Sequence, residues 1–349
     1  APMTATFFFP AMAGIVAAHS RRSKVAPMIP PKDQIKVCFA HAAYQMKASF
    51  DALNTGIASF ELRDGETLDR RIGEADVLVV SGMWHNGLIE LGGRLRFIQS
   101  IGSGTDQFDK EKLTAKGVRL ASAAGVNARA VAEHAMSLIL ALSRRLPEAR
   151  DNQAKRVWRG MIGDLTQRED ELQGKTALII GLGRIGGRLA QLAKAFEMQV
   201  IGFRRHPASG AGAADAVHPL TELPAFLPRA DFVVLTCPLV PETRGVIDAK
   251  ALGLMPASAF LVNCARGGCV VEPALVEALR AGQIAGAALD VTDPEPAQEA
   301  SPLWSMPNVF ITPHTGGETR KYEVNVNEIL VENLERMWRG ETELRNQVV

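Results

Sequence analysis

The sequence has no excess of either charge. Its 349 residues include 39 lysines and arginines against 38 aspartates and glutamates, which leaves a formal net charge of +1. This balance provides no overall field that would hold a nucleic acid or an anionic membrane surface. We therefore expect neither as a partner, and any site for an anion has to be local.

Long apolar runs are also missing after the N-terminus. No later stretch approaches the roughly twenty apolar residues of a membrane-spanning helix. Residues 1–18 are apolar, but the nearest basic residues follow this run instead of preceding it, and Pro10 and Gly14 interrupt it. That order is not typical of an export signal. We expect residues 1–32 to be a loosely attached leader and linker, and the protein to be cytoplasmic.

Cysteine is scarce. The four cysteines are Cys38, Cys237, Cys264 and Cys269, and no two of them form a CxxC pair. This usage favours free thiols in a reducing compartment over a disulfide framework. Cys264 and Cys269 flank a short glycine-containing segment, but no histidine or further cysteine lies nearby to complete a metal site. We expect structural thiols and no bound metal.

Buried strands alternate with helical stretches along most of the chain. A chain of this length normally forms two domains, and the alternation predicts parallel pairing in each. The expected fold is α/β, with two Rossmann-like doubly wound parallel sheets. The predicted strands span residues 35–40, 75–82 and 96–102 in the first unit, and 176–180, 198–203, 231–236, 259–264, 285–291 and 309–314 in the second.

Two long helices are expected around the second unit. Residues 127–146 begin with Asn127 as a candidate N-cap and carry a broad apolar face, so they predict a buried helix at the junction of the units. That face exceeds the need of one domain, which favours self-association. Residues 321–340 are amphipathic, with Gly340 as a candidate C-cap, and we expect this helix to pack back on the first unit.

A glycine-rich turn follows the strand at 176–180. Gly181, Gly183 and Gly186 form G-x-G-x-x-G between this strand and a helical stretch, with Arg184 and Ile185 between the last two glycines. The glycines permit a tight turn and close approach of the backbone to a pyrophosphate, which the helix N-terminus attracts. The alternative is a simple strand-to-helix turn.

Two arginines stand where a carboxylate is usual. Arg204 lies 18 positions after Gly186 and is followed by Arg205 and His206. A carboxylate there accepts hydrogen bonds from a ribose 2′-hydroxyl and repels a 2′-phosphate, whereas a guanidinium pairs with the phosphate. We expect NADP(H) to be preferred. The alternative is a pair of solvated arginines, with NAD(H) bound.

Three charged or titratable residues each follow a buried strand of the second unit, where α/β sheets form their clefts. Arg266 precedes two glycines, Glu295 lies in the sequence DPEP, and His314 lies between a proline and a glycine pair. Each has a structural alternative: a helix-capping arginine, a solvated loop acid and a loop histidine with its hydrogen bonds satisfied.

Together with the glycine turn, these segments resemble the D-isomer-specific 2-hydroxyacid dehydrogenase family. The resemblance extends from about Ile35 to the end of the chain. It rests on the cofactor segment 172–203, the segments 261–296 and 307–317, and the helix segment 125–145. It implies a discontinuous substrate domain, residues 33–126 and 320–349, into which a dinucleotide-binding domain, residues 127–319, is inserted.

The resemblance also implies roles for individual residues. Arg266 would hold the carboxylate and keto oxygen of the substrate, His314 would be the general acid and base, and Glu295 would hydrogen-bond the imidazole. The backbone N–H groups of Ser103 and Gly104 would face the substrate carboxylate, and the nearby segment 80–84 would line the side-chain pocket. Reduction of a 2-keto acid places negative charge on the carbonyl oxygen, so a cationic donor and a proton source are needed there.

Further cofactor contacts follow from the same resemblance. Cys237 and Pro238 would lie under the nicotinamide ribose, Asp290 would lie near the carboxamide, and Gly316 would belong to the same site. For Asp290 the alternative is a hydrogen-bonded structural carboxylate at a strand end.

The expected activity is NADPH-dependent reduction of a small 2-keto acid, of the glyoxylate and hydroxypyruvate class, to the D-2-hydroxy acid. A homodimer through the cofactor domains is implied as well. The alternatives are a dehydrogenase for another small acid, a relative of formate dehydrogenase, and an NAD(H)-sensing corepressor. The pair of Glu295 and His314 argues against a relative of formate dehydrogenase. Arg204 and the short C-terminus argue against an NAD(H)-sensing corepressor.

Overall fold

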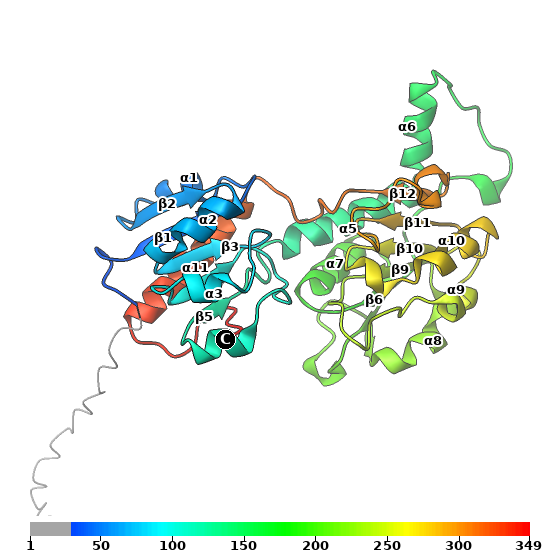
Figure 1. The fold of residues 1–349 in the computed structure, drawn as a ribbon. Helices are drawn as coiled ribbons and strands as arrows, with labels where there is room; N and C mark the ends of the chain where they lie inside the picture. Colours follow the sequence, from blue (N-terminus) through cyan, green and yellow to red (C-terminus); the bar gives the residue numbers. More distant parts are fainter. Residues whose placement is uncertain (1–28) are drawn as a thin grey trace, which may run out of the picture.

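The computed structural model describes residues 29–349, which form two lobes that each contain a parallel sheet (Figure 1). The sheet of the first lobe has the strand order β2-β1-β3-β4-β5. Its strands are β1 (Lys36–Ala40), β2 (Ala58–Leu62), β3 (Val77–Val80), β4 (Phe97–Ser100) and β5 (Arg119–Ala121).

The sheet of the second lobe has the order β12-β11-β10-β9-β6-β7-β8, also with parallel pairs throughout. Its strands are β6 (Thr176–Ile180), β7 (Gln199–Phe203), β8 (Ala216–His218), β9 (Phe232–Leu235), β10 (Phe260–Asn263), β11 (Gly286–Leu289) and β12 (Val309–Ile311). The strand order reverses between β9 and β6, which is where doubly wound sheets bind ligands.

Helices cover the faces of both sheets, as parallel pairing requires. The helices of the first part of the chain are α1 (Met46–Asp51), α2 (Gly65–Arg71), α3 (Leu88–Leu91), α4 (Lys110–Ala115), α5 (Ala128–Ser143) and α6 (Leu146–Ala154). The later ones are α7 (Arg184–Ala195), α8 (Leu223–Phe226), α9 (Ala249–Leu254), α10 (Glu272–Arg280) and α11 (Tyr322–Trp338).

The last helix returns to the first lobe, as the sequence predicts. Val326, Leu330 and Leu334 of α11 belong to the same buried cluster as Phe39 of β1, and the indole N–H of Trp338 donates to the carbonyl of Pro30 at 2.8 Å. The first lobe is therefore discontinuous in sequence, and the C-terminus lies on it (Figure 1). The domain boundaries inferred from the sequence stay a prediction.

The sequence-based prediction missed three strands. β2, β5 and β8 are absent from it, so the second sheet has one more strand than the six expected. β5 and β8 have only three residues each, and β8 is half-buried throughout. Buried apolar runs mark the other strands, and these short segments lack such runs because they lie at or near sheet edges.

The prediction for the junction helix was partly wrong. Asn127 occupies the N-cap position of α5, but its side chain makes no capping hydrogen bond. The apolar face of α5 packs within the second lobe, where Ala135 and Ile139 share a buried cluster with Leu189 of α7. This face is therefore covered by its own domain and gives no support for self-association.

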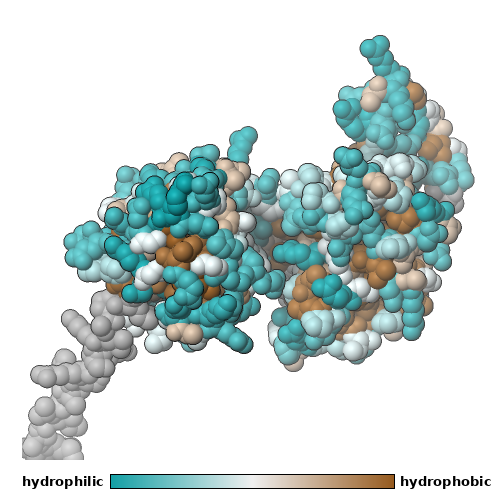
Figure 2. Space-filling view, in the orientation of Figure 1, coloured by the Kyte–Doolittle hydropathy of each residue, from teal (hydrophilic) through white to brown (hydrophobic). Residues whose placement is uncertain are grey.

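A projecting arm was not predicted at all. It comprises α6 and the irregular segment after it, residues 155–170, and it extends away from the body of the second lobe (Figure 1). The space-filling view shows the two lobes meeting at a narrow waist (Figure 2). Within residues 29–349, no helix combines the length and the hydropathy that crossing a bilayer requires. The leader predicted for residues 1–32 lies almost entirely outside the described residues.

Candidate active site

The glycine turn joins β6 to α7, and its three glycines meet different surroundings. A Cβ atom on Gly181 would lie 2.5 Å from the backbone nitrogen of Cys237, and one on Gly186 would lie 2.4 Å from the carbonyl oxygen of Gly181. These two glycines are required by packing of the turn itself. Gly183, by contrast, faces open space, with no atom within 4 Å of its Cβ position, so an elongated ligand has room to approach its backbone.

A cleft of about 840 Å³ runs past this turn. It is of the size that ligand sites in proteins have, and a dinucleotide placed along it would set its pyrophosphate at the N-terminus of α7. The residues present therefore fit a nicotinamide dinucleotide. Among those lining the cleft are Gly181, Gly183, Arg204, Arg205, His206, Cys237 and Pro238.

Arg204 and Arg205 follow β7 directly, at one end of this cleft. The guanidinium of Arg204 donates to the carbonyl of Gly210 at 3.3 Å, and that of Arg205 lies 3.8 Å from the carboxylate of Glu242. Within residues 29–349, no carboxylate forms an ion pair with Arg204. Its charge is therefore not neutralised by a carboxylate in this part of the chain.

Arg184 and Ile185 lie on the other side of the turn. The guanidinium of Arg184 reaches the first lobe, where it donates to the carbonyl of Ala124 and, at 3.1 Å, to the side-chain oxygen of Asn346. Both residues line a cavity of about 420 Å³ between the lobes, and Ser103 lines it from the opposite side. The glycine turn thus borders the crevice between the lobes.

The structure brings Glu295 and His314 together. Glu295 follows β11 and His314 follows β12, and these strands are neighbours in the sheet. The imidazole Nδ1 lies 2.5 Å from the Glu295 carboxylate, so Nδ1 carries the donated proton and Nε2 is left for another partner. His314 has a φ of 55°, a backbone conformation that is uncommon outside glycine and that concentrates at functional sites.

Arg266 lies on the turn after β10, and this turn packs against the loop that carries Glu295. A Cβ atom on Gly267 would lie 2.0 Å from the carbonyl oxygen of Thr292, so only glycine allows the two segments to approach so closely. The buried amide of Asn263 fixes the turn by donating to the carbonyl of Arg266 at 3.1 Å and accepting from the backbone N–H of Ala265 at 3.0 Å.

The guanidinium of Arg266 faces the first lobe. Its Nη2 atom lies 3.5 Å from the Cβ position of Gly104, and its Nη1 atom donates to the carbonyl of Ala265 at 2.7 Å. In the described part of the chain, no carboxylate pairs with Arg266, and neither backbone N–H of Ser103 or Gly104 donates to a protein acceptor. A cation and two free donors therefore meet across the crevice, which suits a small carboxylate.

Asp290 is buried beneath the His314 loop. Its carboxylate accepts from the hydroxyl of Thr312 at 2.6 Å and from the backbone N–H groups of Thr315 at 3.0 Å and Gly316 at 3.1 Å. His134 of α5 lies 3.3 Å from the same carboxylate. Burial alone would raise the pKa of Asp290, but the hydrogen bonds from His134 and Thr312 outweigh it and hold this pKa below its usual value. Asp290 thus has the contacts expected of a hydrogen-bonded structural carboxylate at the end of a strand.

His134, Thr312 and Asn263 are positioning residues that the sequence reasoning missed. Because the Thr312 hydroxyl donates to Asp290, it accepts from Nε2–H of His134 at 3.0 Å, and this bond ties α5 to the His314 loop. The signal for His134 was a titratable residue in a helix that carries a broad apolar face. Asn263 is an amide at the end of a buried apolar strand, and such a group requires hydrogen-bond partners.

Replacing Asp290 with asparagine should lower the free energy of unfolding by about 1–3 kcal/mol at neutral pH, because a buried acceptor of two backbone N–H groups is weakened. This difference in the free energy of unfolding should be constant at pH values well above about 3.9, the pKa of an aspartate in the unfolded chain. It should become smaller as the pH falls through the folded-state pKa of Asp290, which is lower. Urea unfolding monitored at several pH values measures this. Asp151→Asn, at an exposed position on α6, is the matched control, and an equal effect of both variants would contradict the expectation.

Known proteins resemble this chain over the same segments. The family model described as D-isomer specific 2-hydroxyacid dehydrogenase, NAD binding domain, matches residues 136–316. A D-3-phosphoglycerate dehydrogenase of Methanocaldococcus jannaschii is 37% identical over 279 residues, which are 79% of this chain and 52% of that protein. A glyoxylate reductase of Pyrococcus furiosus is 36% identical over 291 residues, which are 79% of this chain and 83% of the relative. The chain thus spans about half the length of the first of these relatives.

Solved structures share the fold. A D-isomer specific 2-hydroxyacid dehydrogenase family protein from Aeromonas salmonicida superposes with a TM-score of 0.79 at 28% identity, covering 90% of this chain and 99% of that one. The TT0316 protein from Thermus thermophilus gives a TM-score of 0.77 at 32% identity, covering 90% of this chain and 100% of that one.

Proposed function

Since the chain belongs to the D-isomer specific 2-hydroxyacid dehydrogenase family, we propose that it reduces a small 2-keto acid to the D-2-hydroxy acid with NADPH. The observation that carries the proposal is the arrangement around the crevice. The hydrogen-bonded pair of His314 and Glu295 stands beside the turn of Arg266, and the cleft at the glycine turn opens on the same edge of the sheet. Cation, proton source and cofactor site therefore belong to one region.

Arg266 binds the substrate in this proposal. Its fork of N–H donors holds the substrate carboxylate and the keto oxygen, while the backbone N–H groups of Ser103 and Gly104 bind the carboxylate from the first lobe. As the keto carbon is reduced, negative charge develops on its oxygen, and the guanidinium stabilises that charge more strongly than it stabilises the ground state.

His314 supplies the proton. Glu295 accepts a hydrogen bond from Nδ1, which orients the ring so that Nε2–H can protonate the substrate oxygen. A bound nicotinamide supplies the hydride to the keto carbon. The product is a hydroxyl group on the former keto carbon, and His314 is left neutral until it takes a proton from solvent.

NADPH is the proposed donor because Arg204 is an unpaired cation at the end of β7. We expect kcat/KM to be at least about tenfold higher with NADPH than with NADH, which corresponds to about 1.4 kcal/mol. Arg204→Asp should remove this preference, since a carboxylate repels a 2′-phosphate and accepts from a 2′-hydroxyl. Steady-state kinetics with both cofactors measure the ratio.

Arg280→Ala, on the exposed surface of α10, is the control for that experiment and should keep the NADPH preference. Equal efficiency of the unmodified protein with both cofactors would remove Arg204 from its proposed role.

The substrate class is tested by a panel. Glyoxylate and hydroxypyruvate are the proposed substrates, supported by the glyoxylate reductase that the chain resembles over 83% of that relative. Oxidation of D-3-phosphoglycerate is the second candidate, favoured by the names of the relatives that share about half their length with this chain. Both are measured by cofactor absorbance, alongside pyruvate and phenylpyruvate. Cofactor binding without turnover of any acid would instead support a sensor and would end the proposal.

We further propose a cytoplasmic homodimer. The four cysteines are free, which suits a reducing compartment. The projecting arm carries Trp158, whose side chain is 98% exposed, together with the exposed Met161 and Leu165. Large apolar side chains gathered on an exposed segment mark a protein contact, and a second copy of the chain would cover them.

Trp158→Asp should therefore halve the mass of the particle in solution. Light scattering after size exclusion should give about twice the 37.6 kDa chain mass for the unmodified protein and the single-chain mass for the variant, because the charge cannot be buried at an apolar contact without a large cost. Leu91→Asp, at an exposed apolar position of the first lobe, should stay dimeric. A dimer in both variants would contradict the assignment of the arm.

A further inference from the structure

Two of the four cysteines lie next to each other beside the proposed cofactor cleft. Cys237 follows β9 and Cys269 lies on the turn after β10, and these strands are neighbours in the sheet. Their Sγ atoms are 4.0 Å apart. Both are free thiols, and the distance is only about 2 Å longer than a disulfide bond.

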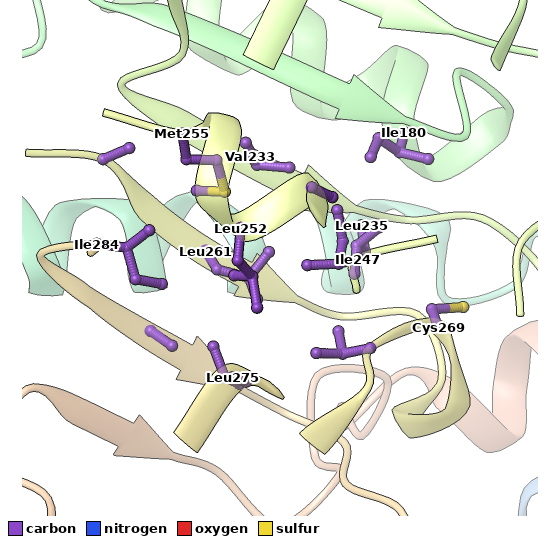
Figure 3. Close-up of a cluster of buried hydrophobic side chains, with 14 of the residues drawn as sticks. Ile180, Val233, Leu235, Ile247, Leu252, Met255, Leu261, Cys269, Leu275 and Ile284 are labelled. Atoms are coloured by element: carbon purple, nitrogen blue, oxygen red, sulfur yellow. The ribbon is translucent and has the colours of Figure 1, made fainter. Parts of the chain in front are cut away.

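The two sulfurs differ in access. Cys237, which is 6% exposed, lines the cleft together with Gly181 and Gly183, so a small reagent approaches it from the space that the cofactor would occupy. Cys269 is fully buried and belongs to the hydrophobic cluster of the second lobe, where it lies at the edge near Ile247 and Leu235 (Figure 3). A reagent therefore meets Cys237 first.

The contact between the two sulfurs shifts their pKa values in opposite directions. The hydrogen bond between the Cys237 and Cys269 sulfurs, in which either can be the donor, lowers the pKa of Cys269, and hydrogen bonds from the Arg266 turn and from Thr243 act in the same direction. The same hydrogen bond, added to burial, raises the pKa of Cys237. Cys269 is thus the favoured thiolate and can take the proton of Cys237 when Cys237 reacts.

We propose that Cys237 and Cys269 form a reversible disulfide in the presence of peroxide, and that this disulfide weakens cofactor binding. The reaction starts from the Cys237 thiol and the Cys269 thiolate. Cys237 attacks hydrogen peroxide: its S–O bond forms, the O–O bond breaks and hydroxide leaves, while Cys269 takes the thiol proton. Cys269 then attacks the oxidised sulfur: the S–S bond forms, the S–O bond breaks, and the leaving hydroxyl takes the Cys269 proton as water.

The consequence for the cofactor follows from packing. The backbone of Cys237 lies directly against Gly181, whose Cβ position is 2.6 Å from the Cys237 Cα atom. Closing the sulfur pair by about 2 Å pulls the Cys237 loop toward the Arg266 turn and away from this contact. The glycine turn then loses the support on which its phosphate-binding conformation depends.

The remaining cysteines provide matched controls. Cys38 is buried in the sheet of the first lobe, and burial raises its pKa to about 12. Cys264 is also buried, with its pKa raised by the same cause. Neither lines the cleft at the glycine turn, and no sulfur–sulfur contact involves either of them in the described part of the chain.

The test treats the full-length protein with hydrogen peroxide, with and without saturating NADP⁺, and then blocks remaining thiols. Intact mass should show the loss of two hydrogen atoms, and peptide mapping should find residues 237 and 269 joined. The Kd for NADPH should rise by at least about tenfold and recover with dithiothreitol, and NADP⁺ should slow the oxidation by occupying the cleft. Cys38→Ser and Cys264→Ser should behave like the unmodified protein.

Variants of the two cysteines test the proposal directly. Cys237→Ser and Cys269→Val should each show a peroxide-independent Kd, and valine suits the buried site at 269 if serine is not tolerated. Absence of the 237–269 link, a link between other cysteines, or a link that leaves the Kd unchanged would each overturn the proposal. The peptide map does not depend on the proposed reductase function, whereas the effect on NADPH binding rests on the cofactor assignment, so the two failures can be told apart.

Discussion

Replacing His314 with glutamine should lower kcat for keto acid reduction by about 10²–10⁴, the usual contribution of a positioned general acid. Glutamine keeps a polar side chain of similar reach but cannot deliver a proton. The Kd for NADPH should stay within about twofold of the unmodified value, since the imidazole binds substrate and not the dinucleotide phosphates. Stopped-flow and steady-state kinetics, with cofactor binding followed by fluorescence, measure both quantities.

The chain offers a matched control for this variant. His218 pairs with Glu222 through the same ring nitrogen, at 2.8 Å, but it lies on β8, away from the crevice. His218→Gln should therefore retain most of the turnover. If His314→Gln kept more than about a tenth of the activity, the proton would have to come from another group.

Replacing Arg266 with alanine should lower kcat by about 10²–10³, the loss seen when one donor to a developing oxyanion is removed. KM for the keto acid should rise as well, because the same guanidinium holds the substrate carboxylate. Arg266→Lys should recover part of the loss, since an ammonium keeps the charge but not the planar fork. Comparing the changes in kcat and in KM for both variants separates stabilisation of the oxyanion from binding of the substrate carboxylate.

A variant at Arg280, exposed on α10, serves as the control for Arg266 as well. The assignment fails if Arg266→Ala changes kcat and KM no more than Arg280→Ala does. It also fails if Arg266→Ala changes only NADPH binding, because the guanidinium would then serve the cofactor and not the acid.

Much of the second lobe could be predicted from sequence because its signals are local. Each of its long strands is a continuous apolar run, which is required where helices cover both faces of a parallel sheet. The glycine turn was identifiable because Gly181 and Gly186 are forced by close contacts within the turn itself. The pairing of Glu295 with His314 was implied by the family resemblance, and the sheet accounts for it because both residues follow strands that end at one edge.

The rest depended on contacts that no local pattern contains. The strand β8 is half-buried and has three residues, so its sequence shows neither an apolar run nor a clear alternation. The apolar face of α5 was attributed to a second subunit, whereas α7 and the sheet cover it. The proximity of Cys237 to Cys269 arises because β9 and β10 are adjacent, which spacing along the chain does not reveal.

Asp290 has structural contacts that the motif did not reveal. The resemblance places it near the cofactor, which stays a prediction, and its contacts with Thr312, Thr315 and Gly316 hold the His314 loop in place. A buried carboxylate needs several donors, and these donors come from the segment that follows β12. Asp290 therefore fixes the backbone of the neighbouring His314 loop.

The most direct measurement is a crystal structure of the protein with NADP⁺ and oxamate, a stable analogue of a small 2-keto acid. The amide carbonyl oxygen of oxamate, which stands in for the keto oxygen, should lie about 2.6–3.2 Å from both Nε2 of His314 and the guanidinium of Arg266, with the oxamate carboxylate on the backbone N–H groups of Ser103 and Gly104. Oxamate bound elsewhere, or an imidazole at 314 turned away from Arg266, would contradict it.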